Sequence, residues 1–134
     1  MVTRLGRRLI AVEQPILAEH GVTMWGYIVL SALARADGSA MRTQAALARA
    51  IGADKTRIIP VLDDLQERGY IERQPDPADR RVHLLALSGA GRDVHGAVRA
   101  AIRREEERLL GRLPAADRAA FLRVLQELGG LGPV

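Results

Sequence analysis

Two short runs of residues that favour extended structure follow directly after a pair of closely spaced helical segments. This order restricts the fold more than any other feature of the chain. The runs cover residues 70–74 and 82–87, and the seven residues between them, 75–81, include two prolines, two aspartates and two arginines. Runs of this kind, joined by a polar segment rich in turn-forming residues, predict a two-stranded hairpin.

The helical segments before the hairpin are marked by residues that cap helices. Thr43 precedes a helix over residues 44–51, and Asp54 precedes a second helix that runs to Arg68 and stops at Gly69. Two helices separated by about three residues form a helix-turn-helix, and a hairpin directly after it completes a winged helix. We therefore predict a mostly α-helical fold, a winged helix-turn-helix with a two-stranded wing.

Pro60 falls in the middle of the second helix of this pair. There it cannot donate the backbone hydrogen bond to the carbonyl of Thr56. The expected result is either a bend absorbed by packing or a kink that re-aims residues 55–57. The directions in which the side chains of residues 55–57 point therefore do not follow from the sequence.

Further helices flank the winged helix on both sides. A first helix covers residues 4–19 and is expected to bend or divide at Pro15, and an apolar helix follows over residues 24–36. Ser88 begins a long helix after the hairpin, and Pro114 begins a last one. The first helix and the last two carry apolar stripes that a winged helix of about 65 residues cannot cover. We expect these stripes to pack against a second copy of the chain.

Composition narrows the function without deciding it. The chain has no cysteine, which excludes disulfides, cysteine-ligated zinc and iron–sulfur clusters. No apolar run approaches the ~18 residues that span a bilayer, and the first residues lack the apolar core of a secretory signal, so a cytoplasmic protein is expected. The formal net charge of +4 permits a polyanionic partner without requiring one. Whether the chain binds a polyanion must therefore be judged from the positions of its basic residues.

Motifs for catalysis are absent from the sequence. There is no phosphate-binding loop, no nucleophile elbow of a serine hydrolase and no zinc-protease motif. Asp63 and Asp64 are adjacent on a helix and so point ~100° apart, which is unsuited to sharing a proton or a metal ion. The histidines His20, His83 and His95 belong to different predicted elements. We expect neither an enzyme nor a bound metal or cofactor.

Two ordered motifs lie in and before the predicted wing. Asp79-Arg80-Arg81 is followed by Leu87-Ser88-Gly89-Ala90-Gly91, and both are preceded by Leu65, Gly69-Tyr70-Ile71 and Arg73. With these motifs, Asp-x-Arg and then Leu-Ser/Thr-x-x-Gly, the segment from Leu47 to Gly91 resembles the MarR family of bacterial winged-helix transcription regulators. The resemblance implies one domain over residues 1–134, with dimerisation helices at about 2–19 and 92–128 and a DNA-binding lobe at about 23–91.

Double-stranded DNA is the partner that both the residues and the resemblance indicate. Lys55, Thr56 and Arg57 lie at the N-terminus of the second helix of the pair, where a recognition helix presents side chains to the major groove. Arg80 and Arg81 lie at the tip of the wing, where a guanidinium group can enter a narrow minor groove. The resemblance makes Arg81 the inserted residue and Asp79 the one that orients the tip.

Contacts to phosphate would complete the DNA interface. Arg49 and Arg73 are the candidates, and such contacts set the register on the duplex without reading its sequence.

The resemblance also implies a homodimer and a small, often aromatic or phenolic, effector in a cleft beside the DNA-binding lobe. By position, such a cleft would be lined by His20, Met24, Trp25 and Tyr27, which are equally compatible with plain core packing. The function expected is a repressor of a pseudo-palindromic operator, relieved by the effector. Two alternatives stay open at this point: a nonspecific architectural DNA-binding protein, and a protein–protein interaction module without DNA binding.

Overall fold

The computed structural model describes residues 2–36 and 42–129 of the chain. These residues divide into two compact units, Met1–Ala100 and Ala101–Val134. The first unit contains the predicted winged helix, and all candidate site residues belong to it. The sequence also predicts a break at Asp37–Ser39 after the apolar helix, and a short extended piece over residues 40–42 that ends at Thr43. Asp37–Ser39, Ala40 and Met41 lie outside the described residues. The division into dimerisation helices and a DNA-binding lobe stays a prediction.

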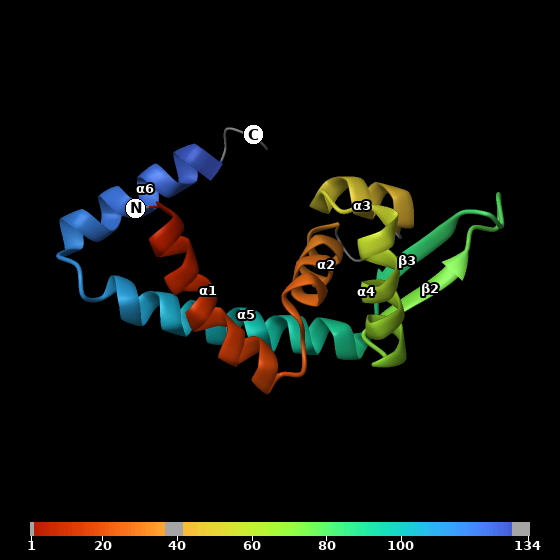
Figure 1. The fold of residues 1–134 in the computed structure, drawn as a ribbon, viewed down its shortest axis with the longest axis horizontal. Helices are drawn as coiled ribbons and strands as arrows, with labels where there is room; N and C mark the ends of the chain where they lie inside the picture. Colours follow the sequence, from red (N-terminus) through yellow and green to blue (C-terminus); the bar gives the residue numbers. More distant parts are fainter. Residues whose placement is uncertain (1, 37–41, 130–134) are drawn as a thin grey trace. The chain divides into compact units, whose positions relative to one another are not determined.

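Helices α1 (Val2–Glu19) and α2 (Met24–Arg35) open the chain (Figure 1). The helix predicted over residues 4–19 is one element that includes Pro15, so the proline does not divide it. Gly21 then takes a left-handed φ of 68°, which a residue with a side chain adopts only with strain. The hydroxyl of Thr23 caps α2 by accepting a hydrogen bond from the backbone N–H of Gly26 at 3.0 Å.

Helices α3 (Gln44–Ile51) and α4 (Lys55–Glu67) form the predicted pair, with three residues between them. Thr43 caps α3, accepting from the N–H of Ala46 at 3.1 Å, and Asp54 caps α4. Gly52, with a φ of 68°, ends α3 and supplies the turn. Helix α4 continues as one element through Pro60.

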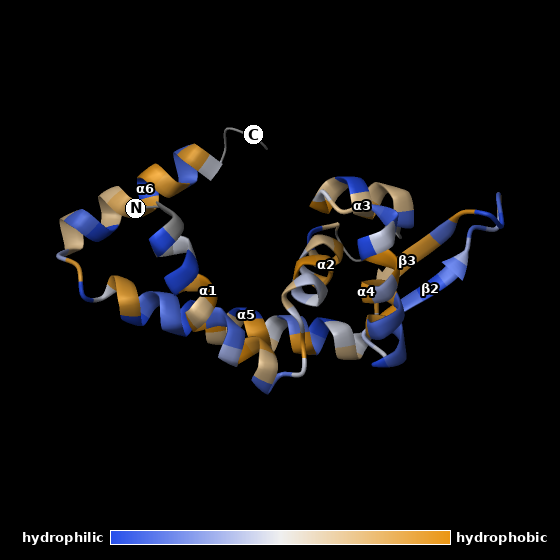
Figure 2. Cartoon of the chain, in the orientation of Figure 1, coloured by the Kyte–Doolittle hydropathy of each residue, from blue (hydrophilic) through white to orange (hydrophobic). Residues whose placement is uncertain are grey.

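The wing is an antiparallel hairpin of β2 (Ile71–Pro75) and β3 (His83–Leu87), with Ile71 opposite Leu87 and Pro75 opposite His83. A third strand that the sequence reasoning did not pair, β1 (Arg42–Thr43), lies on the other side of β3. Figure 2 shows a hydrophilic β2 beside a more hydrophobic β3. The central strand β3 buries Leu85 and Leu87 in the core, whereas β2, at the edge, buries Ile71 and exposes most of its other residues.

The base of the wing is closed onto helix α5 (Gly89–Leu110). The N–H of Ser88 donates to the carbonyl of Tyr70 at 3.1 Å, and the Ser88 hydroxyl donates to the carbonyl of Gly69. The same hydroxyl accepts from the N–H of Gly91 at 3.0 Å, which confirms Ser88 as a cap. A Cβ atom on Gly91 would lie 1.9 Å from the Tyr70 carbonyl oxygen, so only glycine fits there without a backbone shift.

The core of the first unit is made almost entirely of aliphatic side chains. Buried residues come from α1, α2, α3, α4, the sheet and α5. The largest with less than 2% exposure are Leu17, Leu30, Leu47, Ile58, Leu62, Leu65, Leu85, Val29 and Val98. The structure therefore confirms a mostly α-helical winged helix with a short antiparallel sheet.

Helix α6 (Ala115–Gly129) of the second unit has no buried residue. Its large apolar side chains are 36–61% exposed, and they are Phe121, Leu122, Val124, Leu125 and Leu128. In the first unit, Leu9 and Ile10 of α1 are also exposed, at 38% and 49%.

Within the described residues, no single helix is long and apolar enough to cross a membrane. Two consecutive helical segments, Gly6–Glu19 and Met24–Arg35, are together long and apolar enough to cross a membrane, but they are bent by 84° relative to each other. Much of α2 is buried in the core described above.

Candidate nucleic-acid interface

The first turn of α4 presents three exposed side chains in succession, Lys55, Thr56 and Arg57. The turn is held by Asp54, whose carboxylate accepts a hydrogen bond from the backbone N–H of Arg57 at 2.9 Å. A helix N-terminus leaves backbone N–H groups without partners inside the helix, and its dipole favours an anion. The turn therefore combines two cations, a hydroxyl group and a positive helix end.

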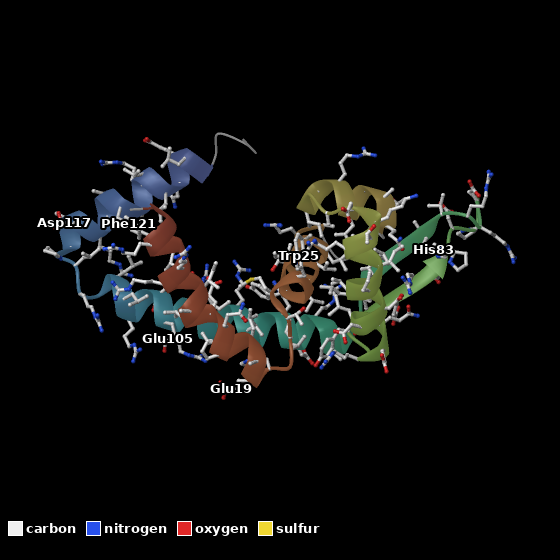
Figure 3. All side chains as sticks on the ribbon, viewed as in Figure 1. Glu19, Trp25, His83, Glu105, Asp117 and Phe121 are labelled. Carbon is white, nitrogen blue, oxygen red and sulfur yellow. The ribbon has the colours of Figure 1, made fainter. Side chains whose placement is uncertain are left out.

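Arg57 also contacts helix α2. Its Cζ atom lies 5.1 Å from the centroid of the Trp25 ring, within the range of a cation–π interaction. Trp25 is labelled on α2 in Figure 3. An interaction of this type is worth ~0.5–1 kcal/mol at an exposed site. The position of one predicted DNA contact thus depends on a residue that the sequence assigned to the effector cleft.

The acidic residues of α4 are paired with arginines. Asp63 accepts from Arg73, whose Nε also donates to the amide oxygen of Gln66 at 3.0 Å. Asp64 pairs with Arg68 at 3.1 Å. The two neighbouring carboxylates diverge, as their spacing predicted. No group of three or more His, Cys, Asp or Glu side chains suited to a metal ion occurs in the described part of the chain.

The tip of the wing is ordered by aspartates. The N–H of Ala78 donates to the carboxylate of Asp76 at 2.9 Å, and the N–H of Arg81 donates to Asp79 at 3.1 Å. The Nε of Arg81 reaches the same oxygen of Asp79 at 3.2 Å, while the side chain of Arg81 is 92% exposed. Arg80 is exposed beside it. Asp79 therefore orients Arg81 while leaving its guanidinium group open to solvent.

The two predicted phosphate contacts have different surroundings. Arg49 is exposed near the end of α3. Arg73, whose side chain is 20% exposed, is held by Asp63 and Gln66 between β2 and α4. Its position within the protein is accounted for by these two acceptors, and a contact with phosphate stays a prediction.

Three of the four residues assigned to an effector cleft have separate partners. The Nδ1 of His20 is 2.8 Å from the carbonyl oxygen of Ile16. Trp25 contacts Arg57, while the Tyr27 ring stacks on His95 of α5 with centroids 5.5 Å apart. Met24 is partly exposed at the start of α2. Among these four described residues, no hydrogen bond or ring contact joins one side chain to another.

His95 is a polar residue that sequence reasoning left out of the site. Its Nε2 lies 3.1 Å from the hydroxyl of Ser31, 64 positions away in the chain. Burial lowers the pKa of His95 below its usual range, and the nearby Arg99 and Arg35 lower it further. Helical spacing places Tyr27 and Ser31 on one face of α2, but nothing local in the sequence indicates which residue of α5 meets them.

Comparison with known proteins gives consistent results. A sequence profile of the MarR family matches residues 20–82. A Thauera aromatica protein, named as a transcriptional regulatory protein for the hcr operon, is 31% identical over 113 residues. That match covers 84% of this chain and 66% of the relative, so the chain spans about two thirds of the relative's length.

Two solved structures are similar over nearly the whole chain. One is the transcriptional repressor CouR bound to a 23-mer DNA duplex, with 28% identity, a TM-score of 0.80, and coverage of 96% of this chain and 89% of that one. The other is the PcaV transcriptional regulator from Streptomyces coelicolor in complex with its natural ligand. It has 27% identity, a TM-score of 0.69, and coverage of 94% of this chain and 89% of that one.

Proposed function

This chain belongs to the MarR family of transcriptional regulators, and from that premise we propose that it binds a pseudo-palindromic DNA site as a homodimer and represses transcription. A small aromatic or phenolic effector releases it. Such a protein acts on DNA in the cytoplasm and needs no catalytic residue.

The main support for DNA binding is that the chain has two exposed basic sites, one on a helix and one at a hairpin tip. Lys55 and Arg57 lie on a helix whose width suits the major groove. Arg80 and Arg81 lie on a hairpin tip that suits the minor groove, where narrow A·T-rich stretches attract arginine. Asp63 and Asp64, which would repel phosphate, are neutralised by arginines.

The dimer is supported by the exposed apolar side chains of α1 and α6. Each of the two helices leaves large apolar side chains exposed, and exposed apolar surface often marks an interaction site. A two-fold symmetric dimer buries the same surface of each copy and presents two recognition helices to two half-sites. The relative CouR is named as a repressor and its structure contains a DNA duplex, which supports both the direction of regulation and the partner.

Release by an effector is supported by the contact between Trp25 and Arg57. An effector shifts an equilibrium only if it binds one state more tightly than the other. A ligand that displaces the Trp25 ring would change the surroundings of Arg57, and therefore the DNA-binding state. The similar PcaV structure contains that protein's natural ligand.

Selection of bound fragments from the source genome, followed by footprinting, tests the proposal. We expect two half-sites related by a two-fold axis, with centres about one helical turn, or ~10 bp, apart. Protection of one isolated half-site at saturation would contradict the paired geometry. Binding without any enriched sequence would favour an architectural DNA-binding protein. If no duplex is bound with salt-dependent affinity, the chain is better described as a protein–protein interaction module.

A further inference from the structure

The face of α4 that points away from the core is apolar at its centre. Ile58, Leu62 and Leu65 are at most 1% exposed and mark the inner face. Thr56, Ile59, Pro60 and Asp63 follow the i, i+3, i+4, i+7 spacing of the opposite face, and all four are exposed. Ile59 is 41% exposed. A methyl group, a branched aliphatic side chain and a proline ring thus occupy the outer surface of this helix.

The edges of this apolar surface are charged in a way that identifies its partner. Lys55 and Arg57 lie in the first turn, on either side of Thr56. Asp63, at the C-terminal end of the surface, is engaged by Arg73. An apolar strip bordered by two cations at a positive helix end matches a polyanion that offers apolar groups between its phosphates.

In the major groove of DNA, the apolar group on the base edges is the C5-methyl of thymine. The other groups at these edges are hydrogen-bond donors and acceptors, for which Ile59 and Pro60 offer no partner. We propose that Ile59, with the methyl of Thr56 and the ring of Pro60, recognises thymine methyl groups in the half-sites. This inference rests on the proposed DNA binding. It gives Ile59 a role in sequence specificity, which the charged residues of α4 alone do not provide.

Replacement of thymine by deoxyuridine tests the proposal, because it removes the methyl group and leaves base pairing intact. The probe is a duplex recovered by the fragment selection, synthesised with thymine or with deoxyuridine at each thymine position in turn. At a contacted position we expect affinity to fall about fourfold, the ratio that corresponds to ~0.8 kcal/mol for one buried carbon. Thymines outside the footprint provide the control.

Substitution of Ile59 completes the test. In Ile59→Ala the penalty for deoxyuridine is expected to fall from about fourfold to near unity at the contacted position. Ile59→Val keeps an aliphatic contact and is expected to retain most of the discrimination. The matched control is Glu67→Ala, an exposed position in the last turn of α4, for which the wild-type discrimination is expected. Alanine is a good helix former and Ile59 is exposed, so circular dichroism is expected to show unchanged helix.

The outcomes separate this inference from the proposed function. If no duplex binds, the proposed function fails, and the role of Ile59 fails with it. If wild-type protein binds the selected duplex equally well with every thymine replaced, DNA binding stands and methyl recognition is overturned. An unchanged deoxyuridine penalty in Ile59→Ala also overturns the assignment to this residue.

Discussion

Helices α4 and α6 are both amphipathic, but only α4 completes its packing within one chain. The inner residues Ile58, Leu62 and Leu65 of α4 are at most 1% exposed. In α6 the apolar residues are at least 36% exposed, and Figure 2 shows hydrophobic positions along the helix. A helix that is satisfied on one face can offer the other to DNA. A helix with an uncovered apolar stripe requires a partner surface.

The largest expected effect comes from placing a charge on the apolar stripe of α6. Leu125→Arg puts a guanidinium group into the proposed dimer interface twice, at a cost of several kcal/mol for burying an unpaired charge. Light scattering at low micromolar concentration is expected to give a monomer with an unchanged helical spectrum. The control is Gln126→Arg, the same charge at the neighbouring polar position, which is expected to remain dimeric. A dimeric Leu125→Arg protein would place the interface elsewhere.

A core substitution in α4 is expected to lower the stability of the fold rather than to change the oligomeric state. Leu62 is fully buried, so Leu62→Ala is expected to lower the free energy of unfolding by ~2–5 kcal/mol. Chemical denaturation at several protein concentrations measures the loss. The difference from wild type is expected to be independent of concentration, because Leu62 packs within its own chain. A loss that varies with concentration would erase the contrast between the two helices.

The two arginines of the wing tip are expected to play different roles in DNA binding. Arg81→Ala is expected to weaken binding by ~1–3 kcal/mol and to relax the preference for A·T pairs that flank the half-sites. Arg80→Ala is expected to be milder, to weaken all duplexes equally, and to lower the salt slope by ~1. Titrations against specific and scrambled duplexes at several salt concentrations distinguish them. Equal, sequence-independent losses would refute insertion of Arg81 into the minor groove.

The smallest effect concerns the pH dependence of folding. Burial, Arg99 and Arg35 lower the pKa of His95 in the folded state, so below about pH 6.5 the unfolded chain binds this proton more readily. Stability is therefore expected to fall as the pH drops from above 6.5 through the lowered pKa. His95→Gln is expected to remove this part of the decline in denaturation curves measured between pH 7.5 and 5.5. An identical pH profile in the variant would contradict the assignment.

The local structure of the first unit was predictable because the signals are local. Thr43, Asp54 and Ser88 each accept the expected backbone hydrogen bond, and the choice of capping residue depends only on nearby chain geometry. The hairpin between β2 and β3 follows from its turn residues in the same way.

Contacts between elements were not predictable, because they depend on how helices cross. Trp25 meets Arg57, and Ser31 meets His95 across 64 positions of sequence. The pairing of Arg73 with Asp63 also joins two elements, whereas the sequence analysis predicted only a contact of Arg73 with phosphate. Composition and periodicity give the residue types in such contacts without the partners.

The start of the wing at Tyr70 can lie against helix α5 because residue 91 has no Cβ atom. At Gly91 a single added carbon would lie 1.9 Å from the Tyr70 carbonyl oxygen and 2.9 Å from its carbon. Each of the nineteen other amino acids carries this carbon and would therefore force a shift of the backbone, whatever its polarity or size. A random library at this position should return glycine alone under selection for folded protein. Glycine is therefore required at the last position of the motif Leu87-Ser88-Gly89-Ala90-Gly91 because the backbone of Tyr70 lies so close. Another residue could replace Gly91 in evolution only if the backbone at Tyr70 moved away.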